Sequence, residues 1–402
     1  MPAIRAAEPL ALHGGAPVRR QRLPYGRQAL SEDDIREVVE VLRSDHLTTG
    51  PRVAEFEEAV AAYVGSREAV SFSSGTAALH GAMFAAGLAA GDEVITTPLT
   101  FCATANSVVY QGAIPRFADV SADTLTLDHD RVRALITGRT KAILPMDYAG
   151  HPADLDALRA VADDHGLMLI EDGCQALGAQ SHGRRVGALS DMTVFSFHPV
   201  KHITTGEGGM VTTNRPEFAA RLRLFRNHGL EAAGARGHDP YPWEWSMVAL
   251  GYNYRLTDIG CALGRSQLRR LDETLAQRRG IAAAYSAAFD GLPGMRCPAV
   301  RPGISPAWHL YPIQLVPDAL QADRAAVFAA LRAEGLGVSA HHRPVHLHPY
   351  YRERFGFRGG ECPVAESAYE RLISLPIFPS MAADDVRDVI DAVHKVLAYY
   401  AR

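Results

Sequence analysis

The sequence predicts an α/β protein whose large domain is built on a mainly parallel seven-stranded sheet. Short, continuous apolar segments alternate with helical patterns, as expected for strands buried on both faces. The length of 402 residues favours two or three domains. We expect an N-terminal arm at 1–30, a large domain at 31–265 and a smaller C-terminal α+β domain at 266–402.

The arm is rich in Ala, Pro, Gly and Arg and has no apolar periodicity. Ser31 then opens a helix, and Asp34 three residues later forms an acidic variant of a capping box. The next apolar residues repeat at helical spacing and form one stripe: Ile35, Val38, Val39 and Leu42.

The remaining elements follow in the order of an α/β fold. The seven strands are expected at 68–72, 93–98, 114–120, 142–147, 167–172, 194–197 and 209–214. A long helix near 257–289 should connect the two domains. The C-terminal domain should then hold a strand at 307–316, a helix at 322–335 and a final helix at 384–400.

Composition excludes several classes of protein. Hydrophobic residues at 47% and charged residues at 21% are typical of a globular chain. A net charge of −4 gives no electrostatic attraction to nucleic acid or anionic lipid. Five widely spaced cysteines do not indicate a disulfide framework or zinc site, and no apolar run is long enough to span a membrane. Because the N-terminus also lacks a secretory pattern, we expect a cytoplasmic protein.

Three segments could carry chemistry, and each has a simpler interpretation. The turn 73–76 could bind an anion at a helix N-terminus, or could be an ordinary helix cap. Asp172 ends a buried strand, where it could bind a metal, a ribose or a protonated ring nitrogen, or simply cap the strand. Lys201 lies on a Gly-rich loop between buried strands, where desolvation would make it nucleophilic, unless it is a surface lysine.

Together, an anion seat, a strand-end acid and a loop lysine match the needs of pyridoxal 5′-phosphate (PLP). Five segments also resemble, in order and spacing, the DegT/StrS family of PLP-dependent nucleotide-sugar aminotransferases: SSGTAAL, DEVITTPLTFCATANSVVYQGAIPRFADV, LIEDGCQALGA, FSFHPVKHITTGEGGMV and GYNYRLTDI. The resemblance covers about residues 20–380 and implies the PLP-dependent transferase fold type I. The motifs are most similar to the branch that makes UDP-4-amino-4,6-dideoxy-N-acetyl-altrosamine, a pseudaminic acid precursor.

The resemblance implies a role for each matching position. Lys201 matches the lysine that forms the internal aldimine with PLP and then moves the proton. Asp172 matches the acid that keeps the pyridine nitrogen protonated, and Gln175 matches a residue near the phenolic oxygen. The phosphate cup would be formed by Gly75, Thr76 and Ser196.

Two further matches concern the ring and the partner subunit. Phe101 matches the aromatic residue that stacks on the cofactor ring. Asn253 matches an asparagine that reaches the phosphate of the neighbouring subunit's cofactor, which implies a homodimer with shared active sites.

Several positions are candidates for catalysis or substrate binding. His198 could tune Lys201 or contact the sugar, or it could be a packed histidine. Arg255 could pair with a diphosphate or with a residue of the subunit interface. Tyr25, Thr49 and the loop that begins at His341 are further candidates for substrate contacts. The spacing of histidines in that loop fits no standard metal-ligand pattern, so we expect no metal.

We therefore expect an aminotransferase that moves an amino group, from L-glutamate, to the ketone of a nucleotide-linked 4-keto-6-deoxy sugar. A UDP-N-acetyl-hexosamine derivative used in surface-glycan synthesis is the first choice. The alternatives are a dTDP- or GDP-keto sugar, a keto-octulosonate or a cyclitol ketone as acceptor. A sugar dehydratase of the same fold would carry His at position 201, and a non-catalytic regulator would not be expected to keep both Asp172 and Lys201.

Overall fold

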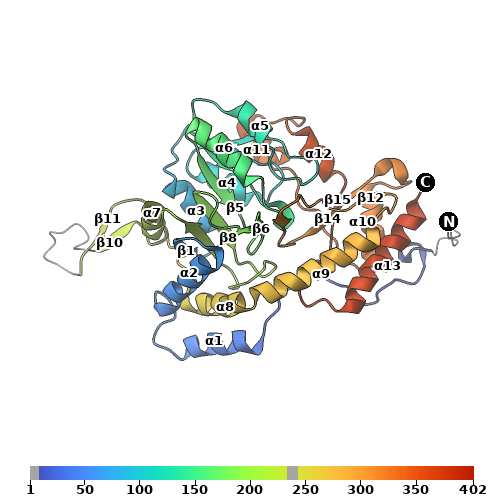
Figure 1. The fold of residues 1–402 in the computed structure, drawn as a ribbon, viewed down its shortest axis with the longest axis horizontal. Coiled ribbons are helices and arrows are strands. Elements are labelled where there is room, and N and C mark those ends of the chain that lie inside the picture. Colours follow the sequence, from blue (N-terminus) through green and yellow to red (C-terminus); the bar gives the residue numbers. More distant parts are fainter. Residues whose placement is uncertain (1–8, 233–242) are drawn as a thin grey trace.

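A seven-stranded sheet forms the centre of the computed structural model, which describes residues 9–232 and 243–402 (Figure 1). The strand order is β1-β9-β8-β5-β4-β2-β3. β9 is antiparallel to both of its neighbours, while the pairs from β8 to β3 are parallel. The strands are β1 (Glu68–Phe72), β2 (Glu93–Thr96), β3 (Ile114–Phe117), β4 (Thr140–Leu144), β5 (Met168–Asp172), β8 (Met192–Ser196) and β9 (Gly209–Thr213).

Helices cover both faces of this sheet, because the strands present apolar side chains in both directions. The first face packs against α3 (Gly75–Ala85), α4 (Ala103–Tyr110) and α7 (Pro216–Arg226). The second face packs against α2 (Pro51–Val64), α6 (Leu155–His165) and α8 (Asp258–Arg269), with α5 (His129–Leu135) beside α6.

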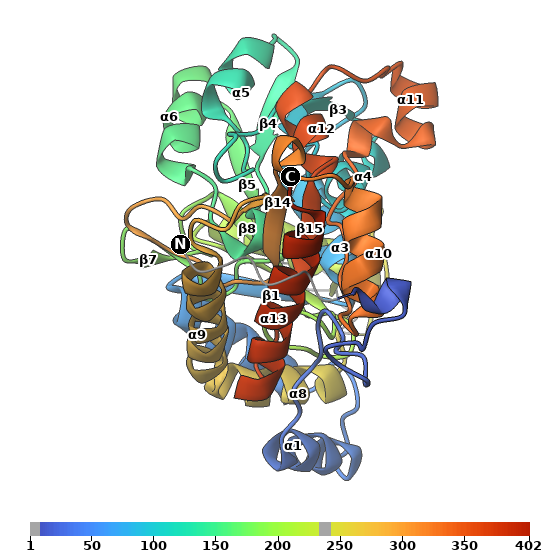
Figure 2. The ribbon, with the colours of Figure 1, turned by 90° about the vertical axis from the view of Figure 1, so that its right-hand side faces the viewer.

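The C-terminal part is built on a second, smaller sheet with the order β12-β14-β15, in which both pairs are antiparallel. Its strands are β12 (Met295–Arg296), β14 (Tyr311–Leu315) and β15 (Leu372–Leu375). Figure 2 shows α9 (Leu271–Phe289), α10 (Arg324–Ala333) and α13 (Ala383–Tyr400) around these strands, and one apolar cluster joins them. The predicted α/β class, with its mainly parallel sheet and its smaller α+β part, is confirmed.

Shorter elements complete the chain. They are α1 (Glu32–Leu42), α11 (Pro349–Phe355), α12 (Pro363–Tyr369), the strands β6 (Gln180–Ser181), β7 (Arg184–Arg185), β10 (Leu230–Ala232), β11 (Trp245–Met247) and β13 (Ile304–Ser305), and single turns of 3-10 helix at Ala11–His13, Tyr148–Gly150, Pro317–Ala319 and Val345–Leu347. No helix of the described residues is long and apolar enough to cross a membrane. All five cysteines are free.

The predicted long helix at 257–289 is wrong in one respect, since it is divided into α8 and α9 at Arg270. The backbone of Arg270 leaves the helical conformation, and its guanidinium instead reaches the carbonyl of Ala29 and the carboxylate of Asp34. The predicted boundary between the two domains, near residue 265, falls inside α8 and remains a prediction.

Helix α1 is attached to α8 through one buried carboxylate. Asp34 accepts from the Ser31 amide at 2.9 Å, which completes the predicted capping box. Its two oxygens also accept from Ser266 at 2.7 Å, from Gln267 at 2.9 Å and from Arg270 at 2.8 Å. These bonds and the Arg270 charge hold the pKa of Asp34 below its usual range although burial opposes this.

Asp34→Ala should therefore lower the free energy of unfolding by about 3 kcal/mol, because it leaves buried donors and the Arg270 charge without their acceptor. Urea denaturation followed by circular dichroism measures this. Asp33→Ala, one residue earlier on the exposed face, is the control and should change stability by less than about 1 kcal/mol. Equal effects of the two variants would contradict the anchoring role of Asp34.

Candidate active site

Lys201 lies on the loop between β8 and β9, at the sheet edge where the parallel strands end. Its backbone N–H donates to the carbonyl of His198 at 2.8 Å, which forms a tight turn beneath the side chain. Burial lowers the pKa of the Lys201 ammonium, although Cys174 and Asp172 act in the opposite direction. The amine is therefore more readily available as a nucleophile and proton acceptor than an exposed lysine.

Asp172 is the last residue of β5 and is only 3% exposed. One carboxylate oxygen accepts from the Thr104 hydroxyl at 2.6 Å, and the other accepts from the Cys174 amide at 3.1 Å. Thr104 is in turn bonded to the hydroxyl of Thr100 at 2.7 Å. The carboxylate is thus fixed in place, with capacity for another donor.

The N-terminus of α3 forms the third part of the site. Ser74 is the cap, and its hydroxyl accepts from the Ala77 amide at 3.0 Å, so the amides of Gly75 and Thr76 remain available as donors. A Cβ atom at Gly75 would lie 2.8 Å from Cβ and 3.0 Å from Oγ of Ser196. Glycine at this position therefore lets the Ser196 hydroxyl approach the helix N-terminus, a suitable arrangement for a phosphate.

These three parts meet around Cys174. Its Sγ lies 3.5 Å from the position of a Cβ on Gly75, and both Asp172 and Lys201 contribute to the pKa of its thiol, which burial raises. An amine, a carboxylate and an anion seat, predicted from separate segments, are therefore neighbours in space. Such proximity is what a single PLP site requires, and the roles of these residues remain a prediction.

A row of rings lies beside the lysine. The ring centroids are 5.4 Å apart for Tyr25 and His341, 4.9 Å for His341 and His342, and 6.0 Å for His342 and Phe101. Burial, with a smaller effect of the Lys201 charge, lowers the pKa of His341 to about 4, so this imidazole is neutral at pH 7. Phe101 is 58% exposed and can cover a flat ligand.

Two other predicted site residues differ in burial: Gln175 is buried, and His198 is exposed. Gln175 is buried, and its side-chain oxygen accepts from the Ala149 amide at 2.7 Å. The imidazole of His198 is exposed, and it is its backbone carbonyl, rather than its ring, that contacts Lys201. A direct effect of the His198 ring on Lys201 is therefore not supported, which leaves sugar contact as its predicted role.

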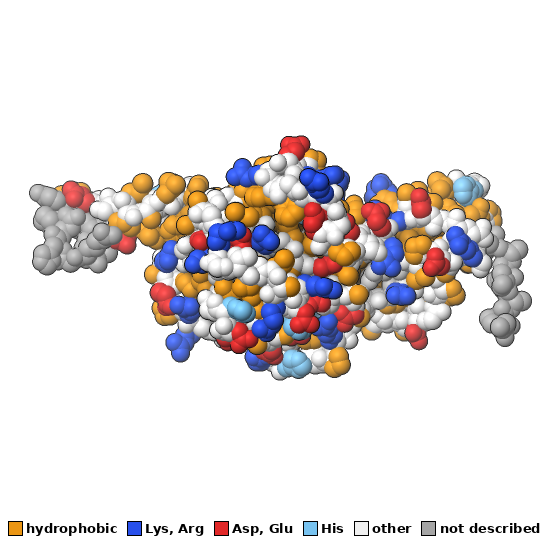
Figure 3. All heavy atoms as spheres, turned by 90° about the horizontal axis from the view of Figure 1, so that it is seen from above, with side chains coloured by type: hydrophobic (Ala, Val, Ile, Leu, Met, Phe, Trp, Pro, Cys, Tyr) orange, Lys and Arg blue, Asp and Glu red, His pale blue; other side chains and the backbone are white. Residues whose placement is uncertain are grey.

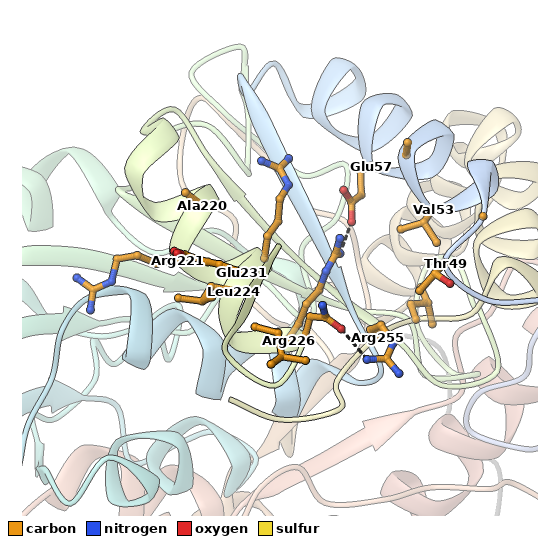
Figure 4. Close-up of a pocket in the computed structure, with 15 residues that line it drawn as sticks. Thr49, Val53, Glu57, Ala220, Arg221, Leu224, Arg226, Glu231 and Arg255 are labelled. Carbon is orange, nitrogen blue, oxygen red and sulfur yellow. Dashed lines mark hydrogen bonds and ion pairs between the residues drawn. The ribbon is translucent and has the colours of Figure 1, made fainter. Parts of the chain in front are cut away.

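Thr49 and Arg255 lie together in a cavity that Lys201 does not line. They line an open cavity of about 600 Å³ between α2 and α7, and Arg255 donates to the side chain of Asn227 at 2.7 Å (Figure 4). Asn253 is exposed and pairs with Asn227 through a short antiparallel bridge. Lys201 does not line this cavity, so the substrate contacts of Thr49 and Arg255 remain a prediction.

One group of possible metal ligands occurs in the described part of the chain: His346, Glu361 and Glu366. The Glu366 oxygen that accepts from His346 at 2.8 Å also accepts from the amides of Gly360 and Cys362. Its lone pairs are already occupied by these donors, so the group does not favour a metal.

Sequence reasoning missed several groups of this site. Thr104 gave no signal because a threonine in a helix is common, and His342 was seen only as one of a histidine-rich loop. It also missed Asp147, a buried acid behind Asp172 whose amide donates to the Asp172 carbonyl at 3.1 Å. Asp147 and the buried Glu171 each leave one carboxyl oxygen without a hydrogen-bond donor, and burial raises the pKa of both groups, with the Glu171 charge adding to the effect on Asp147, so a proton on one of the two carboxyls is favoured.

Known proteins resemble the chain over nearly its whole length. The "Spore coat polysaccharide biosynthesis protein SpsC" of Bacillus subtilis is 42% identical over 381 residues, which is 94% of this chain and 98% of that protein. PseC of Helicobacter pylori, an aminotransferase involved in the biosynthesis of pseudoaminic acid, is 31% identical with a TM-score of 0.88, over 94% of this chain and 100% of that one. The "Putative sugar aminotransferase Spr1654 from Streptococcus pneumoniae, PLP-form" is 29% identical with a TM-score of 0.87, over 94% of this chain and 98% of that one.

Residues 28–394 match the family model, and the chain belongs to the DegT/DnrJ/EryC1/StrS aminotransferase family. Its fold and enzyme class are those of the PLP-dependent sugar aminotransferases. The donor set fits this cofactor, because a helix N-terminus with a serine hydroxyl suits a phosphate, and Asp172 and Lys201 suit a ring nitrogen and an aldehyde.

The Asp147–Glu171 pair should make stability depend on pH. Burial and the neighbouring charge raise the pKa of Asp147, and burial raises that of Glu171, so the folded protein keeps a proton that the unfolded chain releases. This stabilisation is complete below the ordinary carboxyl range and is lost as the pH rises through the raised pKa values. Glu171→Gln supplies an amide donor to Asp147 in place of that proton, so it should gain stability relative to wild type as the pH rises.

Urea unfolding between pH 5 and pH 9 measures this difference. Glu370→Gln, an exposed position, is the control and should follow the wild-type curve. A constant difference between Glu171→Gln and wild type across the range would show that the pair holds no titrating proton.

Proposed function

We propose that the enzyme transfers an amino group from L-glutamate to the ketone of a nucleotide-linked 4-keto-6-deoxy sugar, with a UDP-N-acetyl-hexosamine derivative as the first candidate. The observation that carries the proposal is the convergence of Lys201, Asp172 and the Gly75–Ser196 anion seat around Cys174. The likeness to PseC over the whole chain supports a sugar acceptor of the pseudaminic-acid type. We place the enzyme in the cytoplasm, which the five unpaired cysteines support.

PLP, when bound, supplies an aldehyde that carries the amino group and a ring that withdraws electrons from it. Gly75, Thr76 and Ser196 would hold its phosphate, with Phe101 over its ring and Gln175 near its phenolic oxygen. The Asp172 carboxylate would hold the proton on the ring nitrogen, since Thr104 and the Cys174 amide fix its direction.

Lys201 would bind the aldehyde carbon and would act as the general acid and base of both half-reactions. Its lowered pKa lets the amine exist unprotonated closer to neutral pH, as a base requires. The neutral imidazole of His341 and the hydroxyl of Tyr25 lie within the same row of rings, where they can contact a sugar without adding charge. The exposed His198 could also contact the sugar.

The proposed active form is a homodimer with shared active sites. Ile35 and Leu42 of the predicted apolar stripe are exposed on α1, rather than packed against the chain's own core. More apolar side chains are exposed on β11 and just after it, namely Trp245, Met247 and Leu250, and hydrophobic side chains are visible beside the grey residues at the left of Figure 3. A second copy would cover such surfaces and would bring its Asn253, Thr49 and Arg255 to the lysine site of the first.

Lys201→Ala should lose turnover and the visible absorbance band of the holoenzyme, because no other amine would bind the aldehyde. Absorbance spectra and an assay of amino transfer from glutamate measure the two effects. Lys141→Ala, at an exposed lysine on β4, is the control. Retention of both the band and turnover by Lys201→Ala would contradict the assignment.

Mixing two inactive variants tests the shared site. A hybrid dimer of Lys201→Ala with Asn253→Ala has one site that combines an intact Lys201 with an intact Asn253 from the other subunit. Random reassociation should therefore recover about a quarter of wild-type activity, since half of the dimers are hybrids with one good site of two. Mass spectrometry of tagged subunits verifies that hybrids have formed. If they have formed and no activity is recovered, each chain supplies its own Asn253.

A further inference from the structure

His202 directly follows Lys201 in the chain and is buried, with only 7% of its surface exposed. Its ring Nε2 lies 3.1 Å from the carbonyl oxygen of Ala307. Because a carbonyl oxygen can only accept, Nε2 must carry the proton and donate it. Burial, with smaller effects of the Arg278 and Lys201 charges, lowers the pKa of His202 well below its usual value. The ring is therefore neutral and is held in one tautomer.

This hydrogen bond joins the turn of the active-site lysine to residues 307–310, a segment of the C-terminal part that leads into β14. The segment rests on the turn after β4. The Ala307 amide donates to the carbonyl of Gly150 at 2.9 Å, and the Leu310 amide donates to the carbonyl of Ala149 at 3.3 Å. The histidine bond thus belongs to a contact between the two parts of the chain.

The same contact reaches Gln175. A Cβ atom on Gly150 would lie 2.8 Å from both the Gln175 carbonyl oxygen and the Trp308 nitrogen, so three segments of backbone meet at this glycine. The neighbouring Ala149 amide donates to the Gln175 side chain at 2.7 Å. A displacement of residues 307–310 would therefore disturb both the lysine turn and the support of Gln175.

Little space for water lies beside the histidine bond. Lys201 and His202 line one small cavity of about 10 Å³, which is close to the lower limit for a single water molecule. The ring of His309, whose pKa burial also lowers well below its usual value, has its centroid 5.7 Å from that of His202. Arg278 on α9 donates to the Trp308 carbonyl at 3.1 Å and supplies a positive charge. Neutral rings, a cation and scarce water all disfavour a charge on the lysine.

We propose that His202 is a positioning residue for Lys201, whose bond to Ala307 keeps the lysine turn closed against residues 307–310 and keeps water away from the amine. Without this bond, the carbonyl of the buried Ala307 would lack a donor, which is costly unless water reaches it. Water admitted there would solvate the adjacent lysine and favour its charged form. The inference rests on the proposed function only in taking Lys201 as the residue that binds the cofactor.

A pH titration of the visible absorbance band of the holoenzyme tests this role, because the band reports the proton on the Lys201 nitrogen. His202→Phe keeps a ring in place but cannot donate to Ala307. Its midpoint should therefore rise by about one pH unit, a tenfold gain in proton affinity, as water favours the charged form. His202→Gln is uncharged and keeps an N–H donor of similar reach, so it should restore the wild-type midpoint.

His394→Phe is the matched control. His394 lies exposed on α13, and its ring Nε2 donates to the carbonyl of Ala288 at 3.0 Å, so the variant removes the same kind of bond elsewhere in the chain. The midpoint of this variant should equal that of wild type.

Three results would overturn the proposal: a wild-type midpoint in His202→Phe, a midpoint in His202→Gln that follows His202→Phe, or an equal rise in His394→Phe. Long-range proton–nitrogen NMR of the wild-type holoenzyme does not require His202→Phe to fold. With the His202 signal assigned by its loss in His202→Gln, Nε2 should carry the proton, and a proton on Nδ1 would also overturn the proposal. Failure of the proposed function would be seen separately, as no spectral change when wild-type holoenzyme meets glutamate.

Discussion

The candidate active site depends on a carboxylate held at the end of a buried strand. Asp172 terminates β5 in the middle of the sheet, where two donors, the Thr104 hydroxyl and the Cys174 amide, fix its two oxygens. A negative charge in this position is costly unless it is hydrogen-bonded or paired, and the amine of Lys201 and a protonated ring nitrogen are the cations that can pair with it. Burial raises the pKa of Asp147 and of Glu171 behind the same strand end, which disfavours further negative charge there.

Close backbone approaches place the other groups around this charge. Gly75 lets Ser196 approach the N-terminus of α3, and Gly209 at the start of β9 comes so near to Ser74 that a Cβ there would lie 2.5 Å from its carbonyl oxygen. Small residues therefore set the distance between β8, β9 and α3, and this distance defines the size of the anion seat. The lysine turn between β8 and β9 is fixed by the same strands, so the sheet positions the amine relative to the seat.

Much of the fold and the centre of the site could be predicted from sequence, because both have local signals. Buried strands appear as apolar runs, and Asp172, Lys201 and the turn before α3 each follow or precede such a run. Thr104 and the pairing of Asp147 with Glu171 could not be predicted, since their roles come from contacts between residues distant in sequence. The apolar stripe of α1 could be predicted from its helical periodicity. The periodicity did not show that Ile35 and Leu42 would remain exposed in a single chain.

The most direct test of the account is the acceptor itself. The holoenzyme should be incubated with glutamate and, in separate reactions, with UDP-, dTDP-, GDP- and CDP-linked keto sugars, and the product followed by mass spectrometry. The account predicts an amino sugar in the UDP reaction, with the dTDP- and GDP-linked sugars as the alternatives. If glutamate still converts the cofactor but none of these sugars receives the amino group, the acceptor is not a nucleotide-linked sugar. That result would point to a free keto sugar acid or a cyclitol ketone.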